Sequence, residues 1–389
     1  MKVSLLLPTR NRLEYLRYAV ETVLRQEGGP EWELVVSDND STDDIAGHLE
    51  SLADPRIVYV RTERLLPVTE NWNNALEHAS GDYALMLGDD DGLVPGALAR
   101  FGELAERFER PDLVYTGAWL FSYPGVMPDH PEGLLRDYSY ATFMRGRDEP
   151  FALAPERARR LVRQAMEFRL RYGFNMQFAW LGRALLDDLG RDGPVFRSEF
   201  PDYYAMNAAF LRARRILVEP KPLVVIGVTP KSYGFFHAQA REKEGREFLD
   251  PGAAAGGPMP GSNINTGWLS ALDELHRSHG AEIGAPPSRR RYRLLQIAHV
   301  YEQVYVDGTL GPDDLAAIRA HQGHAGRLAW GVAGRAAALL QRVLPRKAFG
   351  ALRFLSHRAR GQFPHWDPKP LDGAHRTLAE VFEDPRVRA

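Results

Sequence analysis

The chain has 389 residues, 44% of them hydrophobic, so it can form one large or two medium domains with a sizeable core. Its formal net charge of −2 gives no sign of the positive field typical of nucleic-acid binders, so no nucleic-acid partner is expected. Cysteine is absent, which excludes disulfides and thiolate metal sites and fits a reducing compartment. The N-terminal apolar run is too short for a signal peptide, and no stretch is long enough to span a membrane. We therefore expect a cytoplasmic protein, soluble or peripheral to a membrane.

Short apolar runs alternate with amphipathic stretches over the first 120 residues. The pattern predicts helices at 13–26, 70–79 and 95–108, and strands at 3–7, 33–37, 57–60, 83–87 and 113–121. This alternation is typical of an α/β domain with a mostly parallel, Rossmann-like sheet flanked by helices.

The second half of the chain becomes more helical. Helices are predicted at 155–171, 178–189 and 202–212, and a strand pair at 216–219 and 223–228. Residues 250–267 are rich in Gly, Pro and Ala, which is typical of a flexible linker or a lid loop. The expected organisation is an α/β domain over 1–249, this linker, and a helical C-terminal extension over 268–389.

One part of the C-terminal extension is basic and amphipathic. Residues 315–366 contain no acidic residue but nine Lys or Arg. By helical period, one face carries Leu328, Val332, Ala336, Leu339 and Val343. Another face, roughly 100° away, carries Arg327, Arg335, Arg342 and Arg346. The pattern fits a helix that lies on an anionic membrane, or a helix packed on the protein with a solvated basic rim.

Three adjacent carboxylates, Asp89, Asp90 and Asp91, follow the predicted strand at 83–87. Like charges at a strand end repel one another, so a cation is expected among them. Hard oxygen ligands suit Mg²⁺ or Mn²⁺, which take their remaining ligands from water and substrate phosphates. The alternative is a polar loop in which these residues cap the next helix.

Polar clusters follow two further strands of the predicted sheet, at 8–12 and 37–43. In such sheets ligands bind beyond the carboxyl ends of the strands, so the three clusters should surround one crevice. Neither a Gly-x-Gly-x-x-Gly fingerprint nor a Walker A loop is present. A nucleotide diphosphate held through a metal is the simplest expected ligand.

These segments resemble family 2 glycosyltransferases of the GT-A fold. The resemblance is strong over residues 1–120, fair to about 235 and absent afterwards, and it rests on residues 3–12, 35–43, 70–83 and 87–98. The chain departs from the pattern at Gly88, where the family commonly has Asp, so the carboxylates shift towards Asp89, Asp90 and Asp91.

The resemblance implies a role for individual residues. Asp90 is the first choice for the metal ligand, Asp91 would ligate through water, and Asp89 would face the ribose or donor sugar. His237 is a further candidate metal ligand, although a lone His is more often structural. The remaining residues expected to bind the nucleotide-sugar are Pro8, Thr9, Arg10, Asn11, Asp38, Asn39, Asn71 and Asn74.

The resemblance also implies a general base. Asp202 stands at the start of a later predicted helix, where family members carry the acidic residue that activates the acceptor hydroxyl. The alternative is that Asp202 only caps that helix, and the two roles are compatible.

The sequence therefore predicts a metal-dependent inverting glycosyltransferase of the hexosyltransferase type. It would move one sugar from a nucleotide-diphospho-sugar, a UDP-sugar being favoured, to a surface glycan or lipid-linked acceptor at the inner face of the cell membrane. No Gln-x-x-Arg-Trp segment of processive synthases is present, which favours single-sugar transfer. The alternatives are a non-catalytic subunit that binds nucleotide or glycan, kept open by Gly88, and a sugar nucleotidyltransferase, which needs a Gly-rich phosphate loop that residues 8–11 do not resemble.

Overall fold

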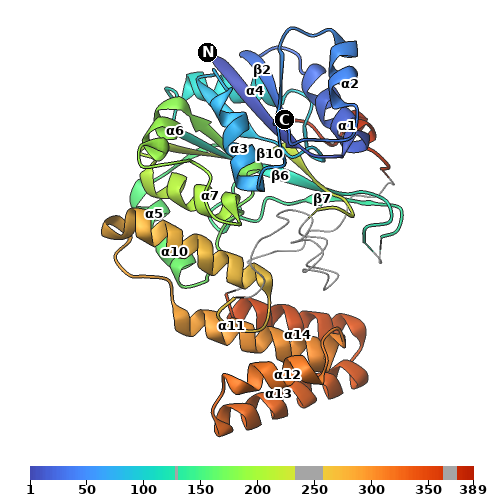
Figure 1. The fold of residues 1–389 in the computed structure, drawn as a ribbon, viewed down its shortest axis with the longest axis vertical. Helices are drawn as coiled ribbons and strands as arrows, with labels where there is room; N and C mark the ends of the chain where they lie inside the picture. Colours follow the sequence, from blue (N-terminus) through green and yellow to red (C-terminus); the bar gives the residue numbers. More distant parts are fainter. Residues whose placement is uncertain (128–129, 233–256, 362–374) are drawn as a thin grey trace. The chain divides into compact units, whose positions relative to one another are not determined.

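The computed structural model describes residues 1–127, 130–232, 257–361 and 375–389 (Figure 1). Its described residues divide into two compact units. The first comprises residues 1–162, 172–232 and 375–389, and the second comprises 163–171 and 257–361.

The first unit is built on a ten-stranded mixed sheet in the order β3-β2-β1-β4-β9-β6-β10-β5, with β7 on β6 and β8 on β10. Strands β1 to β4 are parallel, and so are β6 and β10. Strand β9 lies between β4 and β6 and is antiparallel to both, so β1, β2, β3, β4, β6 and β10 point the same way. The strands are β1 (Lys2–Thr9), β2 (Glu31–Asp38), β3 (Ile57–Arg61), β4 (Tyr83–Met86), β5 (Gly92–Leu93), β6 (Leu113–Ser122), β7 (Leu134–Asp137), β8 (Phe151–Leu153), β9 (Ala179–Gly182) and β10 (Ile216–Val228).

Helices of the first unit pack on this sheet and on one another (Figure 1). They are α1 (Leu13–Leu24), α2 (Ile45–Leu52), α3 (Val68–Glu77), α4 (Ala97–Arg107), α5 (Pro155–Met166, of which the residues from 163 on fall in the second unit), α6 (Arg183–Gly190), α7 (Pro201–Arg212) and α15 (Leu378–Glu383), with the short 3₁₀ helix η1 (Met176–Phe178). Helix α4 follows Gly96, whose φ of 81° favours glycine, and buries Leu98, Phe101 and Leu104. The sheet and its covering helices confirm the predicted α/β class.

Two predictions of secondary structure were wrong in detail. The helix predicted at 178–189 is strand β9 followed by α6, because Trp180 on β9 is fully buried and its ring stacks on Phe101 at 4.2 Å. The strand pair predicted after 216 is the single strand β10, whose pairing with β6 shifts register around Pro222.

The second unit is helical, as the sequence predicts for the C-terminal extension. Its elements are α10 (Asn263–Ile283), α11 (Arg289–Glu302), the π-helical turn η2 (Gln303–Asp307), α12 (Pro312–Ala320), α13 (His324–Val343) and α14 (Arg346–Ala359). A small core of Ile297, Val300, Tyr301, Leu315 and Ile318 joins α11 to α12, and side chains of η2 and α13 pack against it. No helix in the described ranges is both long and apolar enough to cross a bilayer.

The domain boundaries at 249/250 and 267/268 stay predictions, since residues 250–256 of the predicted linker lie outside the described residues. Two findings bear on them. Helix α10 already begins at Asn263, and residues 375–389 belong to the first unit.

Candidate active site

Four chain segments meet at one edge of the sheet, beyond the carboxyl ends of strands that point the same way. Strands β1 and β2 end in register, with Thr9 beside Asp38. The segment 87–91 follows β4 and begins with a hydrogen bond from Leu87 N to Leu6 O. Residues 227–232 at the end of β10 come to the same place, because Gly227 N donates to Asp91 Oδ1 at 2.8 Å. Ligand sites in open α/β sheets lie at such an edge.

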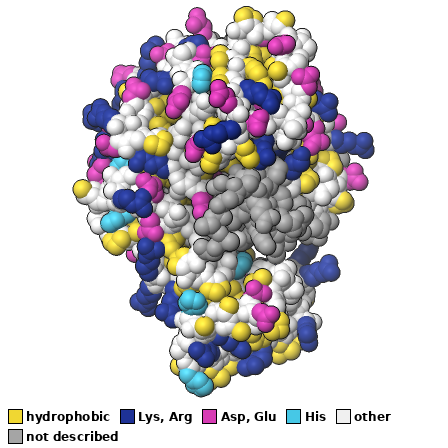
Figure 2. All heavy atoms as spheres, viewed as in Figure 1, with side chains coloured by type: hydrophobic (Ala, Val, Ile, Leu, Met, Phe, Trp, Pro, Cys, Tyr) yellow, Lys and Arg dark blue, Asp and Glu magenta, His cyan; other side chains and the backbone are white. Residues whose placement is uncertain are grey.

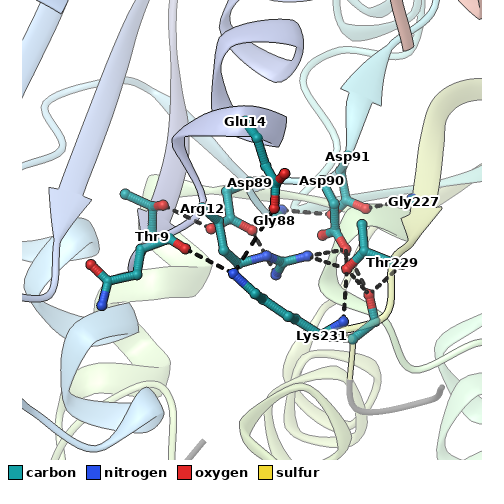
Figure 3. A network of polar contacts seen from close by, with 12 residues as sticks. Thr9, Arg12, Glu14, Gly88, Asp89, Asp90, Asp91, Gly227, Thr229 and Lys231 are labelled. Carbon is teal, nitrogen blue, oxygen red and sulfur yellow. Dashed lines mark hydrogen bonds and ion pairs between the residues drawn. The ribbon is translucent and has the colours of Figure 1, made fainter. Parts of the chain in front are cut away.

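Arg12 is the centre of a polar network at this edge (Figure 3). Its guanidinium lies 2.8 Å from Asp89 Oδ1 and 2.6 Å from Asp90 Oδ2, and it donates to Thr229 Oγ1 at 2.6 Å. Thr9 Oγ1 donates to the second oxygen of Asp89 at 2.7 Å. One largely buried cation therefore contacts two buried carboxylates from the segment after β4 and offsets part of their negative charge.

The charges of this network shift the pKa values of its members. Burial raises the pKa of Asp89 above its ordinary value, and the charge of Arg12 opposes that rise. Burial alone lowers the pKa of Arg12, but Asp89 and Asp90 more than offset this, so the net pKa is raised. Arg12 therefore stays charged, and the edge keeps a fixed positive group among its carboxylates.

Asp90 is the member of the acidic run with an open oxygen. Its Oδ2 accepts from Arg12, from Ser232 Oγ at 2.7 Å and from Thr229 Oγ1 at 3.3 Å. Its Oδ1 has no hydrogen-bond partner within the described ranges. This oxygen can take a further ligand without breaking an existing contact.

Asp91 is occupied differently. Its Oδ1 accepts from Gly227 N, and its Oδ2 accepts from Gly88 N at 2.6 Å and from Nε2 of Gln177, which lies on η1. The side chain is buried, which raises the pKa of the carboxyl above its ordinary value. Asp91 thus ties the segment after β4 to β10 and η1.

The loop after β2 is held by the residues predicted to bind nucleotide. Asp38 is fully buried and accepts from Ser41 N at 3.0 Å and from Tyr59 Oη at 2.7 Å. Asn39 exchanges hydrogen bonds with the backbone of Leu66, both at 2.8 Å. These contacts hold the loop through the protein's own side chains and backbone.

Helix α3 and the loop after β1 complete this frame. Ser37 Oγ donates to Asn71 Oδ1 and accepts from Asn74 Nδ2, both at 2.7 Å. Asn11 has a positive φ of 51°, and its Oδ1 accepts from Thr42 N at 2.6 Å. The predicted residues Pro8 and Arg10 flank Thr9, with Pro8 paired to Ser37 in the sheet and Arg10 donating a backbone hydrogen bond to Asp89.

Asp202 lies in the first turn of α7, which has Phe200 as its N-cap residue and begins at Pro201. Its Oδ1 accepts from Tyr203 N at 2.8 Å. Burial raises the pKa of this carboxyl to about 6. No hydrogen bond joins Asp202 to the Arg12 network among the residues the structure describes, so its place at the reacting centre stays a prediction. His237 lies outside the described residues.

The chemistry of the carboxylates tests whether a divalent metal fits here. Asp90 offers a hard oxygen atom, its Oδ1, that has no hydrogen-bond partner in the described ranges. The oxygens of Asp89 accept from Arg12 and Thr9, and those of Asp91 accept from N–H donors, so neither has a fully open oxygen. In the described part of the chain no group of three or more His, Asp or Glu is arranged to hold a metal. The residues fit an ion that has few protein ligands and takes the others from phosphate and water, as Mg²⁺ and Mn²⁺ do.

Several members of the site were not among the predicted site residues. Arg12 stands in the predicted polar segment at 8–12 and contacts Asp89 and Asp90. The sequence signal was a basic residue in a segment predicted to lie at the same sheet edge as the acidic run. Thr229 and Ser232 come from the end of β10, and the sequence offers no signal that their hydroxyls reach Asp90. Lys231, whose Nζ donates to Asn11 O at 3.2 Å, adds a second cation at this edge.

Residues 4–161 match the model of Glycosyl transferase family 2, so this part of the chain is a domain of that family. A Campylobacter jejuni GalNAc(5)-diNAcBac-PP-undecaprenol beta-1,3-glucosyltransferase is 36% identical over 101 residues, which is 25% of this chain and 32% of that protein. An Escherichia coli UDP-Glc:alpha-D-GlcNAc-diphosphoundecaprenol beta-1,3-glucosyltransferase is 32% identical over 89 residues, 23% of this chain and 35% of that protein. A putative teichuronic acid biosynthesis glycosyltransferase of Bacillus subtilis is 37% identical over 143 residues, 35% of this chain and 55% of that protein. The matches thus span between about a third and a half of these relatives.

Among solved structures, S. aureus TarS 1-349 is similar, with a TM-score of 0.46 and 16% identity over 96% of this chain and 98% of that one.

Proposed function

We propose that the chain is a metal-dependent inverting glycosyltransferase that moves one sugar from a nucleotide-diphospho-sugar to a lipid-linked or surface-glycan acceptor. The observation that carries the proposal is the pair Asp89 and Asp90, buried around Arg12 at the carboxyl edge of the sheet in a family 2 domain. The names of two relatives support a diphosphoundecaprenol-linked acceptor, and one of them supports a UDP-sugar donor.

The donor would lie along the edge formed by β1, β2 and β4. Asp38 and the loop it holds would face the nucleoside, and the diphosphate would lie near Arg12 and Lys231, whose charges complement it. Asp90, through its open Oδ1, would hold Mn²⁺ or Mg²⁺, which would neutralise charge that builds on the leaving diphosphate, and Asp89 would face the ribose or donor sugar. Asp91 is left out of this metal site because its oxygens are already hydrogen-bonded.

Asp202 would act as the general base. The acceptor hydroxyl oxygen attacks the anomeric carbon, its proton passes to the Asp202 carboxylate, and the bond from that carbon to the diphosphate oxygen breaks. Attack opposite the leaving group inverts the anomeric centre. A pKa raised to about 6 supports this role, because a base works best when its pKa lies near the working pH.

The protein would act as a peripheral membrane protein at the inner face of a cell membrane, where it would meet a lipid-linked acceptor. The basic C-terminal helices support this step, because they carry no acidic residue between positions 315 and 366.

Thermal stability against a panel of nucleotide-sugars, with Mn²⁺ or with EDTA, tests the donor site. A ligand that binds only the folded state adds about 2.7 kcal/mol to the free energy of unfolding at a hundred times its Kd, and this raises the Tm. We expect one nucleotide class to stabilise wild type only with metal, and Asp90→Asn to lose this effect. The matched control Asp192→Asn changes an exposed carboxylate and should keep it. Stabilisation by no nucleotide would favour the non-catalytic subunit instead.

A further inference from the structure

Helices α13 and α14 carry an apolar face that the rest of the second unit leaves uncovered. Leu328 is 61% exposed, Leu339 60%, Val343 64% and Leu355 58%. In the described ranges every exposed large hydrophobic side chain lies on these two helices, and the set, here called the outer apolar face, is Leu328, Val332, Leu339, Leu340, Val343, Leu352 and Leu355. Seven such residues gathered on two helices are unusual for a surface that faces only water.

The inner side of α13 uses small residues for packing. Gly331 and Gly334 are its only buried residues, and a Cβ on Gly334 would meet the ring of Tyr305 at 2.6 Å. Trp330 packs against the core of the unit. At 100° per residue, these positions lie on average roughly 140° around the helix from Leu328 and its apolar neighbours. The large apolar side chains of α13 therefore point away from the protein.

Helix α14 repeats this arrangement with charged residues on its inner side. Arg353 donates to Glu302 at 2.6 Å and to Asp307 at 2.9 Å, and His357 lies 2.8 Å from Glu302. Leu352 and Leu355 lie roughly 100–160° from this paired face by the helical period. No residue of α14 is buried, so packing does not explain its leucines.

The two helices of the outer apolar face carry charge of one sign. Neither helix contains an acidic residue. Their exposed Arg and Lys residues without an ion pair among the described residues are Arg327, Arg335, Arg342, Arg346, Lys347 and Arg358. Figure 2 shows hydrophobic and basic side chains interspersed over the part of the unit that holds these helices.

These observations select the occupant of the face. A second copy of the chain would bring the same cations together across a two-fold interface, which is unfavourable. A nucleic acid would pair with the cations but leave the leucines in water. An anionic lipid surface satisfies both, because acyl chains accept apolar side chains and headgroups attract Lys and Arg.

We propose that the outer apolar face of α13 and α14 docks on an anionic lipid bilayer, with its leucines and valines at the boundary between headgroups and acyl chains. Helix α13 would lie in the membrane plane over its length of about 30 Å. This docking face would provide the membrane binding of the proposed function. It rests on that function only for the reason to dock, which is access to a lipid-linked acceptor.

Sedimentation of the full chain with vesicles tests the proposal. The probes are vesicles of phosphatidylcholine alone and vesicles with about a third phosphatidylglycerol. Wild type should bind the anionic vesicles, and raised salt should weaken binding by screening. Leu328→Ser/Leu339→Ser should weaken it by at least about tenfold, because two apolar side chains no longer insert.

A charge-matched pair of variants isolates the basic contribution. Arg335→Gln/Arg342→Gln should weaken binding by roughly fivefold for each charge removed. Arg290→Gln/Arg388→Gln changes net charge equally at exposed positions outside α13 and α14 and should bind as wild type does. All variants change exposed side chains, so the Tm should stay within a degree or two.

Three results would overturn the proposal: no binding of wild type to anionic vesicles, equal loss in both charge-matched variants, or concentration-dependent dimerisation that Leu328→Ser/Leu339→Ser abolishes. The last would make the face an interface between copies. Donor stabilisation measured on the same samples separates this inference from the proposed function. Vesicle binding without donor stabilisation rejects only the proposed activity, and the reverse rejects only the docking face.

Discussion

Arg12 Nη2 lies 2.6 Å from Asp90 Oδ2, so a cation from the loop after β1 contacts the carboxylate proposed to bind metal. The same guanidinium contacts Asp89, and both carboxylates are almost fully buried. Arg12 therefore offsets part of the negative charge of these two carboxylates. A divalent ion at Asp90 would add to this charge or displace it, and Arg12 would then be free to contact the diphosphate.

Replacing Arg12 should expose this competition. Arg12→Gln removes the cation between two buried carboxylates, which should lower the free energy of unfolding by about 3 kcal/mol or more. Added Mn²⁺ should restore part of that loss, and should raise the Tm of the variant more than that of wild type. Differential scanning fluorimetry with and without Mn²⁺ measures both effects. Arg17→Gln, an exposed position on α1, is the control. If Mn²⁺ stabilises Arg12→Gln no more than wild type, the ion does not share these carboxylates.

Asp91 and Asp90 should respond differently to the same substitution. Whichever way the new amide of Asp91→Asn turns, its NH₂ faces at least one N–H donor, from Gly227 or from Gly88 and Gln177. We expect a loss of about 1–3 kcal/mol in the free energy of unfolding. Asp90→Asn can place its NH₂ at the Oδ1 position, which lacks a partner, so its stability should change little while metal-dependent donor binding is lost. Chemical denaturation of the two variants measures the difference, and equal stabilities would remove the structural role assigned to Asp91.

The part of the site that the sequence predicts comes from local signals. Short polar segments after β1, β2 and β4 follow buried strands, and parallel strands bring their ends to one edge. The roles of Asp90 and Asp91 within the acidic run could not be told apart, because the partners of Asp91 lie far away in the chain. Gly227 is 136 residues from it and Gln177 is 86 residues away.

Local sequence patterns also failed at two places in the fold. The segment around Trp180 was predicted as helix, because a short apolar run has no clear period when it is buried on both faces. The return of the C-terminus to the first unit was not predicted either. It depends on distant contacts, such as the hydrogen bond from Ala389 N to Pro95 O and the packing of α15 on α1.

The pH dependence of turnover should report Asp202. A general base must be ionised to accept the proton, and burial raises the pKa of this carboxyl to about 6. We expect kcat/KM to be level above pH 6 and to fall about tenfold for each unit below it. Asp202→Asn should lose about 10²–10⁴-fold in kcat and keep donor binding.

A merely structural role for Asp202 predicts something else. In that case Asp202→Asn would lose stability. If Asp202 is the base, the Tm at pH 7 should not fall, because the amide removes a charge that burial already disfavours. Asp192→Asn is the matched control on the surface. A wild-type profile that stays level down to pH 5 would remove Asp202 as the base.

Glu33 on β2 should make the stability of the first unit depend on acid. Its carboxylate contacts Lys2 Nζ at 2.5 Å and accepts from Ser4 Oγ and Ser80 N, both at 2.6 Å. Burial alone would raise its pKa, but these hydrogen bonds outweigh burial and lower the pKa from 4.5 to about 2. A depressed pKa contributes stability that is present above pH 4.5 and is lost as the pH falls towards 2. Glu33→Gln should therefore be less stable than wild type at pH 7, by about 1–3 kcal/mol, and lose less stability than wild type over that acid range.

Urea unfolding at pH 7, 4.5 and 3 measures this difference. Glu31→Gln changes an exposed carboxylate two residues earlier on the same strand and is the matched control, which should follow wild type at each pH. The side chains of Glu31 and Glu33 point to the same face of β2, but only Glu33 is buried. Only the Glu33 substitution therefore removes an acceptor from the donor groups of Lys2, Ser4 and Ser80. If Glu33→Gln and wild type lost stability in parallel between pH 4.5 and 3, the acid sensitivity would have to come from other carboxylates.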